Sequence, residues 1–177
     1  MRKNISDHQR FTFINDLLEI CNNQKLDLSI KVHPAEWSVA WDCMRIINNE
    51  LSDHQVKAKI IAGGSIERIF DQFGLLILDI ISTRVLSIAI GVDIPIVLYL
   101  PEEHPVNTPY FSDLESRVYV VRNRQELIDI LAIYQQEGLS SKYDRVFVEK
   151  YLGCFDPNSA MQIVSDQVFN LELEKVC

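Results

Sequence analysis

The sequence predicts an α/β fold, a Rossmann-like three-layer sandwich built on a parallel sheet of about five strands. Short apolar runs alternate along the chain with longer segments whose apolar residues recur at helical spacing. The run over residues 75–81 is almost wholly apolar, which is typical of a central strand covered by helices on both faces. Strands that alternate with helices are joined by right-handed crossovers and therefore pair in parallel. At 177 residues the chain, residues 1–177, corresponds to a single domain.

In the first half of the chain, helix signals separate three strand-like runs. Residues 7–22 carry an apolar stripe at helical spacing, and residues 35–51 follow a proline that suits a helix start. Residues 66–73 lie between an N-cap serine and a glycine, which predicts a two-turn helix. The predicted strands of this half are 28–32, 59–62 and 75–81.

In the second half, capping residues mark the helices. Ser82 and Thr83 offer N-cap oxygens to a helix that ends near Gly91, and Gly138 ends a helix predicted over 124–136. The other predicted segments are strands at 94–100 and 117–121, a loop at 101–112, a polar, irregular or partly helical stretch at 140–151, and a terminal helix at 160–173.

Composition and charge exclude several classes of protein. The chain has 17 Lys and Arg against 25 Asp and Glu, a net charge of −8, so the basic surface of a nucleic-acid-binding protein is missing. Asp93 and Pro95 interrupt the richest apolar stretch, residues 85–100, which is too short to span a membrane. The first residues hold no apolar core of a signal peptide. We therefore expect a cytoplasmic protein with no nucleic-acid partner and no transmembrane segment.

The cysteines predict free thiols in a reducing compartment. None of them forms a C-x-x-C pair or stands near a His at a zinc spacing, and no metal site or cofactor motif is apparent. The sequence also has no G-x-G-x-x-G and no Walker A motif, which disfavours a dinucleotide or P-loop site. The four cysteines are Cys21, Cys43, Cys154 and Cys177.

Polar residues follow the predicted strands where ligands bind in parallel α/β sheets. His33 follows the first strand, Gly64 and Ser65 follow the second, and Ser82 and Thr83 follow the third. Helix starts with unpaired N–H groups suit phosphate, so this pattern indicates a phosphorylated ligand, either a nucleotide or a nucleotide-sugar. Each feature also has a plain structural explanation: a helix cap, a tight turn, or a histidine packed against a helix end.

Taken in order, these segments resemble the carboxyl-terminal, donor-binding half of GT-B-fold glycosyltransferases, especially surface-polysaccharide and CDP-glycerol-type transferases. The resemblance covers roughly residues 28 to 170. The segments that carry it are KVHP (31–34), IIAGGSIE (60–67), LDIIST (78–83), AIGVDIPIV (89–97) and YLG (151–153), followed by Ala160 and Ile163-Val164.

The resemblance implies roles by position. His33 would lie near the donor diphosphate, which makes it the candidate for stabilising that group, although the catalytic residue itself stays unassigned. Ser82 and Thr83 would bind the diphosphate, Arg84 could add a positive charge, and Gly64 with Ser65 would lie close to the base and ribose. The implied function is nucleotide-sugar binding in cell-surface polysaccharide biosynthesis, with no metal and no cofactor.

Two departures from the family keep alternatives open. Ser87 stands where many GT-B enzymes carry a ribose-binding Glu, and the chain supplies only one of the two Rossmann-like halves. We therefore expect a carboxyl-terminal fragment or split half, inactive without an acceptor-binding domain or partner chain, with a tendency to form a homodimer. The alternatives are a nucleotide-sugar 2-epimerase-like domain, which the Ser at position 87 disfavours, and a non-catalytic α/β binding or scaffolding module.

Overall fold

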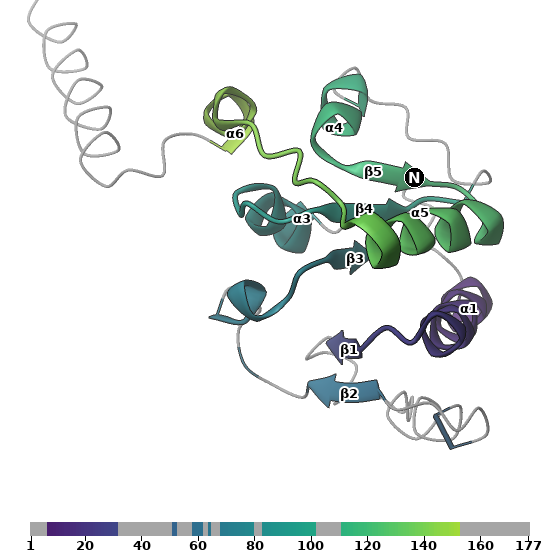
Figure 1. Ribbon diagram of the computed structural model, residues 1–177. Helices are drawn as coiled ribbons and strands as arrows, with labels where there is room; N and C mark the ends of the chain where they lie inside the picture. The colour runs from purple at the N-terminus through teal and green to yellow at the C-terminus, as the bar shows by residue number, and fades with distance from the viewer. Residues whose placement is uncertain are drawn as a thin grey trace, which may run out of the picture.

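The computed structural model describes residues 7–31, 51–52, 58–61, 64, 68–79, 83–101 and 111–152 (Figure 1). Each of its strands overlaps a run predicted from the sequence. The strands are β1 (Leu28–Lys31), β2 (Ala58–Ile61), β3 (Leu76–Leu78), β4 (Ile96–Tyr99) and β5 (Tyr119–Val121). The helices are α1 (Asp7–Gln24), α3 (Thr83–Ile90), α4 (Phe111–Arg117), α5 (Arg124–Glu137) and α6 (Arg145–Leu152), with a 3₁₀ turn η3 (Phe70–Gln72).

The strands pair in parallel, as predicted, but they form two sheets. β1 pairs with β2 in one sheet, and β3, β4 and β5 form the other with β4 in the centre. In Figure 1 the arrows of β1 and β2 run in the opposite direction to those of β3, β4 and β5. The α/β class and the parallel pairing are confirmed, whereas the single sheet expected from the sequence is divided in two.

The division follows from the connection between β2 and β3. A parallel pairing of these strands needs a crossover, usually a full helix, that returns the chain to the starting edge. In place of the two-turn helix expected over 66–73, the described part of this segment holds only η3, whose Phe70 is buried in the core. The chain therefore enters β3 running opposite to β2 (Figure 1).

Helices cover both faces of the β3–β4–β5 sheet, which gives this part of the fold its three layers. Because side chains alternate along a strand, Ile96 and Leu98 of β4 pack on one face and Val97 packs on the other. The first face meets α3, α4 and α6, and the second meets α1 and α5. All three of these β4 residues are fully buried. The sequence favours residues 75–81 as the central strand, but β3, which lies within that run, is at the edge of the described sheet, and β4 takes the centre.

α4 was not expected from the sequence. It begins in the last two residues of the predicted loop 101–112 and includes Arg117, which was expected to start a strand. Phe111 and Leu114, one turn apart, both pack against the core, but seven residues are too few to set up a recognisable helical pattern. α6 falls in the stretch 140–151 that was expected to be irregular or partly helical.

Some predictions concern residues outside the described ranges. These include residues 35–50 of the helix expected at 35–51, the helix expected at 160–173, and three of the four cysteines. The fourth, Cys21, is a buried free thiol whose pKa is raised to about 11 by its burial. Within the described residues, no helix has both the length and the apolar character needed to cross a bilayer.

Candidate functional site

The parallel register brings the carboxyl ends of β3, β4 and β5 to one edge of their sheet. Leu78 of β3 is in register with Leu98 of β4, which is in register with Val120 of β5. The backbone N–H of Leu100 donates to the carbonyl of Val121 at 2.8 Å, so the pairing of the last two strands continues past Tyr99. Ligands of open parallel α/β sheets bind at this kind of edge, which we call the carboxyl edge.

α3 begins at this edge. Its first helical residue, Thr83, follows the end of β3 at Leu78 after a short connection. The first N–H groups of a helix have no acceptor within the helix, and the helix dipole makes this end positive. α3 packs against the sheet through Leu86, Ala89 and Ile90, and this packing fixes where its first turn lies. The backbone of Thr83 and Arg84 thus occupies a position suited to an anion.

Arg122 reaches the same edge from β5. Val118 and Val120 pack on the face of the sheet that α3 covers, and alternation directs Arg122 to that face too. Its guanidinium lies 5.4 Å from the ring centroid of Phe111 at the start of α4. No carboxylate among the described residues is paired with it, so its charge is free to meet a ligand.

The neighbouring Arg124 has a different role. Its Nε lies 2.9 Å from a carboxylate oxygen of Asp16, and its Nη2 lies 2.9 Å from one of Glu19, so it ties α5 to α1. Hydrogen bonding to Glu19, followed by the charge of that carboxylate, raises the pKa of Arg124. Arg122 was not among the site residues predicted from the sequence, because all of those follow the first three predicted strands, whereas Arg122 follows the fifth. An arginine directly after a strand was the signal available.

The start of α5 is already occupied by its own side chains. The Oδ1 of Asn123 accepts from the N–H of Glu126 at 3.0 Å. In return, the Glu126 carboxylate accepts from the N–H of Arg122 at 2.6 Å and from Asn123 Nδ2 at 2.8 Å. This reciprocal cap places a negative group at the helix end, so α5 offers no second anion site at the carboxyl edge.

The residues singled out from the sequence are placed only in part. His33, Ser65 and Ser82 lie outside the described residues, and for Thr83 and Arg84 the backbone alone is described. Gly64 is exposed and has a φ of 71°, a left-handed conformation that favours glycine and fits a tight turn after β2.

The two-sheet arrangement changes the reason for grouping these residues. His33 and Gly64 were expected beside Thr83 because the carboxyl ends of all strands would meet at one edge. In Figure 1, however, β2 ends at the opposite side from the end of β3, so Gly64 follows a strand that leads away from the carboxyl edge. The direction of the strands therefore gives no reason to expect His33, Gly64 and Ser65 beside α3. Their proposed roles rest on the family resemblance alone.

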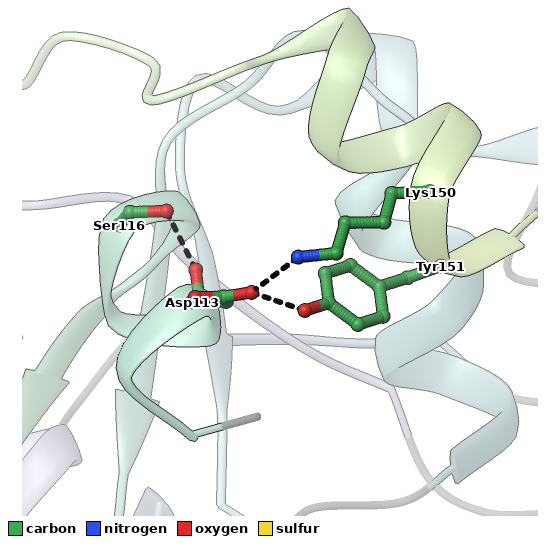
Figure 2. Close-up of polar contacts among 4 residues, drawn as sticks. All are labelled: Asp113, Ser116, Lys150 and Tyr151. Atoms are coloured by element: carbon green, nitrogen blue, oxygen red, sulfur yellow. Dashed lines mark hydrogen bonds and ion pairs between the residues drawn. The ribbon is translucent and has the colours of Figure 1, made fainter. Parts of the chain in front are cut away.

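A second polar cluster joins α4 to α6 (Figure 2). The hydroxyl of Tyr151 donates to a carboxylate oxygen of Asp113, and Lys150 Nζ lies 2.9 Å from the same oxygen. Ser116 Oγ donates to the backbone carbonyl of Asp113 at 2.6 Å, within α4. The hydrogen bond from Tyr151, and then that from Lys150, lowers the pKa of Asp113. The pKa of Lys150 is raised, first by its hydrogen bond with Tyr151 and then by that with Asp113. We call Asp113, Lys150 and Tyr151 the Asp113 clamp.

The clamp is suited to holding structure. Both donors of α6 meet one carboxylate oxygen of Asp113, and Tyr151 also packs its ring 4.7 Å from that of Phe147, whose side chain is buried in the core. Elsewhere, no three His, Cys, Asp or Glu side chains of the described residues gather as metal ligands. Comparisons with protein-family models, curated proteins and solved structures find no match to the chain.

Proposed function

We propose that the chain is the nucleotide-sugar-binding half of a glycosyltransferase of cell-surface polysaccharide synthesis. The donor diphosphate would lie at the carboxyl edge of the β3–β4–β5 sheet. The observation that carries the proposal is that the first turn of α3 and the unpaired Arg122 lie on the same face and at the same edge of this sheet. That the ligand is a nucleotide-sugar, and not another phosphorylated molecule, is proposed from the family resemblance of the surrounding segments.

The chemistry follows from charge. When the bond between sugar and diphosphate breaks, negative charge grows on the phosphate oxygens of the leaving group. The N–H groups of the first α3 turn would donate to one phosphate, and the guanidinium of Arg122 would form charge-assisted hydrogen bonds with the other. Ser82, Thr83 and Arg84 would complete this set, with His33 as a further cation as the resemblance implies. No metal is needed for this arrangement.

A titration tests the proposal. The full chain, labelled with ¹⁵N, is titrated with UDP, CDP and GDP while the backbone amide signals are followed. We expect shifts centred on Thr83, Arg84 and Arg122. Arg122→Ala should weaken binding about tenfold or more, because one charge-assisted contact is worth roughly 1.5–3 kcal/mol.

Arg145→Ala is the matched control for this experiment. Arg145 is a second arginine, with an exposed side chain that pairs with Glu149 at 2.7 Å within α6. Its loss should leave nucleotide binding unchanged. A chain that shows no shift at α3 or Arg122 with any of the three nucleotides would refute the proposed site, as would an Arg122→Ala variant with wild-type affinity.

The division into two sheets favours a second candidate, a non-catalytic α/β binding module. A donor-binding half of the GT-B type builds its site on one continuous parallel sheet, whereas here the β1–β2 pair is separate. In that case nucleotide would still bind at α3 and Arg122. When the chain is combined with an acceptor-binding partner, a binding module would neither hydrolyse nor transfer the sugar, whereas a glycosyltransferase half would. An activity assay of the combined chains therefore distinguishes the two functions.

A further inference from the structure

The opposite, amino edge of the β3–β4–β5 sheet holds a fully buried guanidinium. Arg117, the last residue of α4, has no exposed side-chain surface. Its Nε donates to the carbonyl of Ile90 at 3.0 Å and its Nη2 to that of Val92 at 2.5 Å. These carbonyls lie at the end of α3 and in the turn after it. The remaining nitrogen, Nη1, is buried and has no hydrogen-bond partner.

The charge of Arg117 is only partly compensated. The carboxyl end of a helix carries roughly half a negative charge, and α3 offers this through the Ile90 carbonyl. The carboxylate that attracts the guanidinium, Asp93, is exposed and makes no direct contact with it. Burial lowers the pKa of Arg117, and the pull of Asp93 opposes this. A buried donor left without an acceptor costs free energy, so Nη1 is a site where an acceptor would stabilise the fold.

One connecting segment covers this guanidinium. Residues 138–144 link α5 to α6, and the ring centroid of Tyr143 lies 5.7 Å from Arg117 Cζ. Tyr143 is 40% exposed, so one side of its ring already faces solvent while the ring lies against the guanidinium. The adjacent Lys142 donates from Nζ to the carbonyls of Glu115 and Val118, at 3.2 and 3.1 Å. Lys142 Nζ also lies 4.1 Å from the Tyr119 ring centroid, so a second cation lies on the same connecting segment as Tyr143.

We propose that Nη1 of Arg117 binds an oxyanion of the phosphate or carboxylate class at the amino edge, and that Tyr143 is the gate to this site. The two unused N–H groups of Nη1 would donate to the oxyanion, and Lys142 would add attraction through the adjacent segment. In a site of low dielectric this pairing is stronger than at the surface. The site does not depend on the proposed nucleotide site, because it lies at the other edge of the sheet.

The direct test follows the side-chain N–H signals of arginine in the full, ¹⁵N-labelled chain. The chain is titrated with sodium phosphate, sodium acetate and sodium chloride at constant ionic strength. We expect saturable shifts of the Arg117 Nε–H signal and of the Tyr143 amide with phosphate or acetate, and none with chloride. A response to phosphate alone identifies a phosphate ligand, and a response to acetate alone identifies a carboxylate. Absence of both, or shifts confined to Thr83 and Arg122, overturns the proposal.

Thermal unfolding gives a second readout. At roughly ten times the dissociation constant, the effective anion should raise the Tm by about 3–6 °C over chloride. Tyr143→Ala removes the gate, so it should reach the same shift at a lower anion concentration. Val146→Ala, a change at a side chain of α6 that is 71% exposed, is the matched control and should respond as wild type does. A Tyr143→Ala response equal to that of the control contradicts the gate.

Arg117→Lys tests the site itself. This variant keeps the positive charge but loses the planar guanidinium, and a full response to the anion in this variant contradicts the site.

Discussion

At the scale of single residues, the carboxylate of Asp113 makes the polar contacts that join α4 to α6. Two donors from α6 reach it, the hydroxyl of Tyr151 and the ammonium group of Lys150. Both donors favour the charged carboxylate, and this is why the pKa of Asp113 lies below its ordinary value. The clamp therefore stabilises the fold only while Asp113 is ionised.

The pH dependence of this clamp has a definite sign. Because the pKa of Asp113 is lower in the folded chain than in the unfolded one, its contribution is fully present above the unfolded value, about 3.9, and is lost as pH falls through the folded value. Asp113→Asn should therefore unfold in acid with a weaker pH dependence below about pH 4 than the wild-type chain. The measurement is the urea midpoint followed by circular dichroism at a series of pH values.

Tyr151→Phe is the companion variant for the clamp. It keeps the ring contact with Phe147 but removes the hydroxyl that donates to Asp113. Its pH dependence should lie between that of wild type and that of Asp113→Asn, since Lys150 still contacts the carboxylate. Parallel pH curves for wild type and Asp113→Asn would show that the clamp contributes nothing to stability.

At the scale of elements, α5 shows how a helix end is fixed by its own residues. Asn123 supplies the oxygen that accepts from Glu126 N–H, and Gly138 at the other end has a φ of 77°. A glycine tolerates this left-handed conformation, so the helix end expected at Gly138 is confirmed. Between these ends, Leu127 and Leu131 are buried against α1 and the sheet.

The cap of α5 can be tested by substitution. Asn123→Ala removes the accepting oxygen and should lower the free energy of unfolding by about 0.5–2 kcal/mol. Asn123→Ser keeps an oxygen at the N-cap and should recover most of the loss. Urea unfolding of the three chains measures the effect. An alanine variant as stable as wild type would mean that water satisfies the helix end equally well.

At the scale of the whole molecule, stability depends on the central strand of the larger sheet. Leu98 of β4 is fully buried and lies between β3 and β5, on the face covered by α3 and α6. Leu98→Ala should lower the free energy of unfolding by about 2–5 kcal/mol, because it removes a packed side chain and leaves a cavity. Ile133→Ala, at a position 45% exposed on α5, should cost less than about 0.5 kcal/mol. Equal losses in chemical denaturation would show that the sheet is not the core of the fold.

Assembly belongs to this scale as well. The sheet has β3 and β5 at its edges, and an open edge can pair with another chain. The segment before α6 protects β5 in part, since Tyr119 donates to the Ser140 carbonyl at 2.9 Å and Lys142 donates to that of Val118. The homodimer and the acceptor-binding partner expected from the sequence stay predictions.

Local patterns were sufficient to predict most elements from the sequence. The apolar runs at 75–81 and 94–100 contain β3 and β4, and the glycine at 138 ends α5, because strand and helix formation depend on residues close together in the chain. The start of α3 at Thr83 followed from the same local logic. For α4, seven residues gave too weak a pattern, and only its packing against the core makes it a helix.

The tertiary structure alone decided which distant residues meet. Asp113 and Tyr151 are 38 positions apart, and Arg117 reaches Ile90 over 27 positions, so no spacing in the sequence signals either contact. The separation of β2 from β3 and the position of Arg122 at the carboxyl edge have the same cause. Local signals decide what each segment becomes, while the burial of apolar faces against one another decides where each segment lies and which polar groups are brought together.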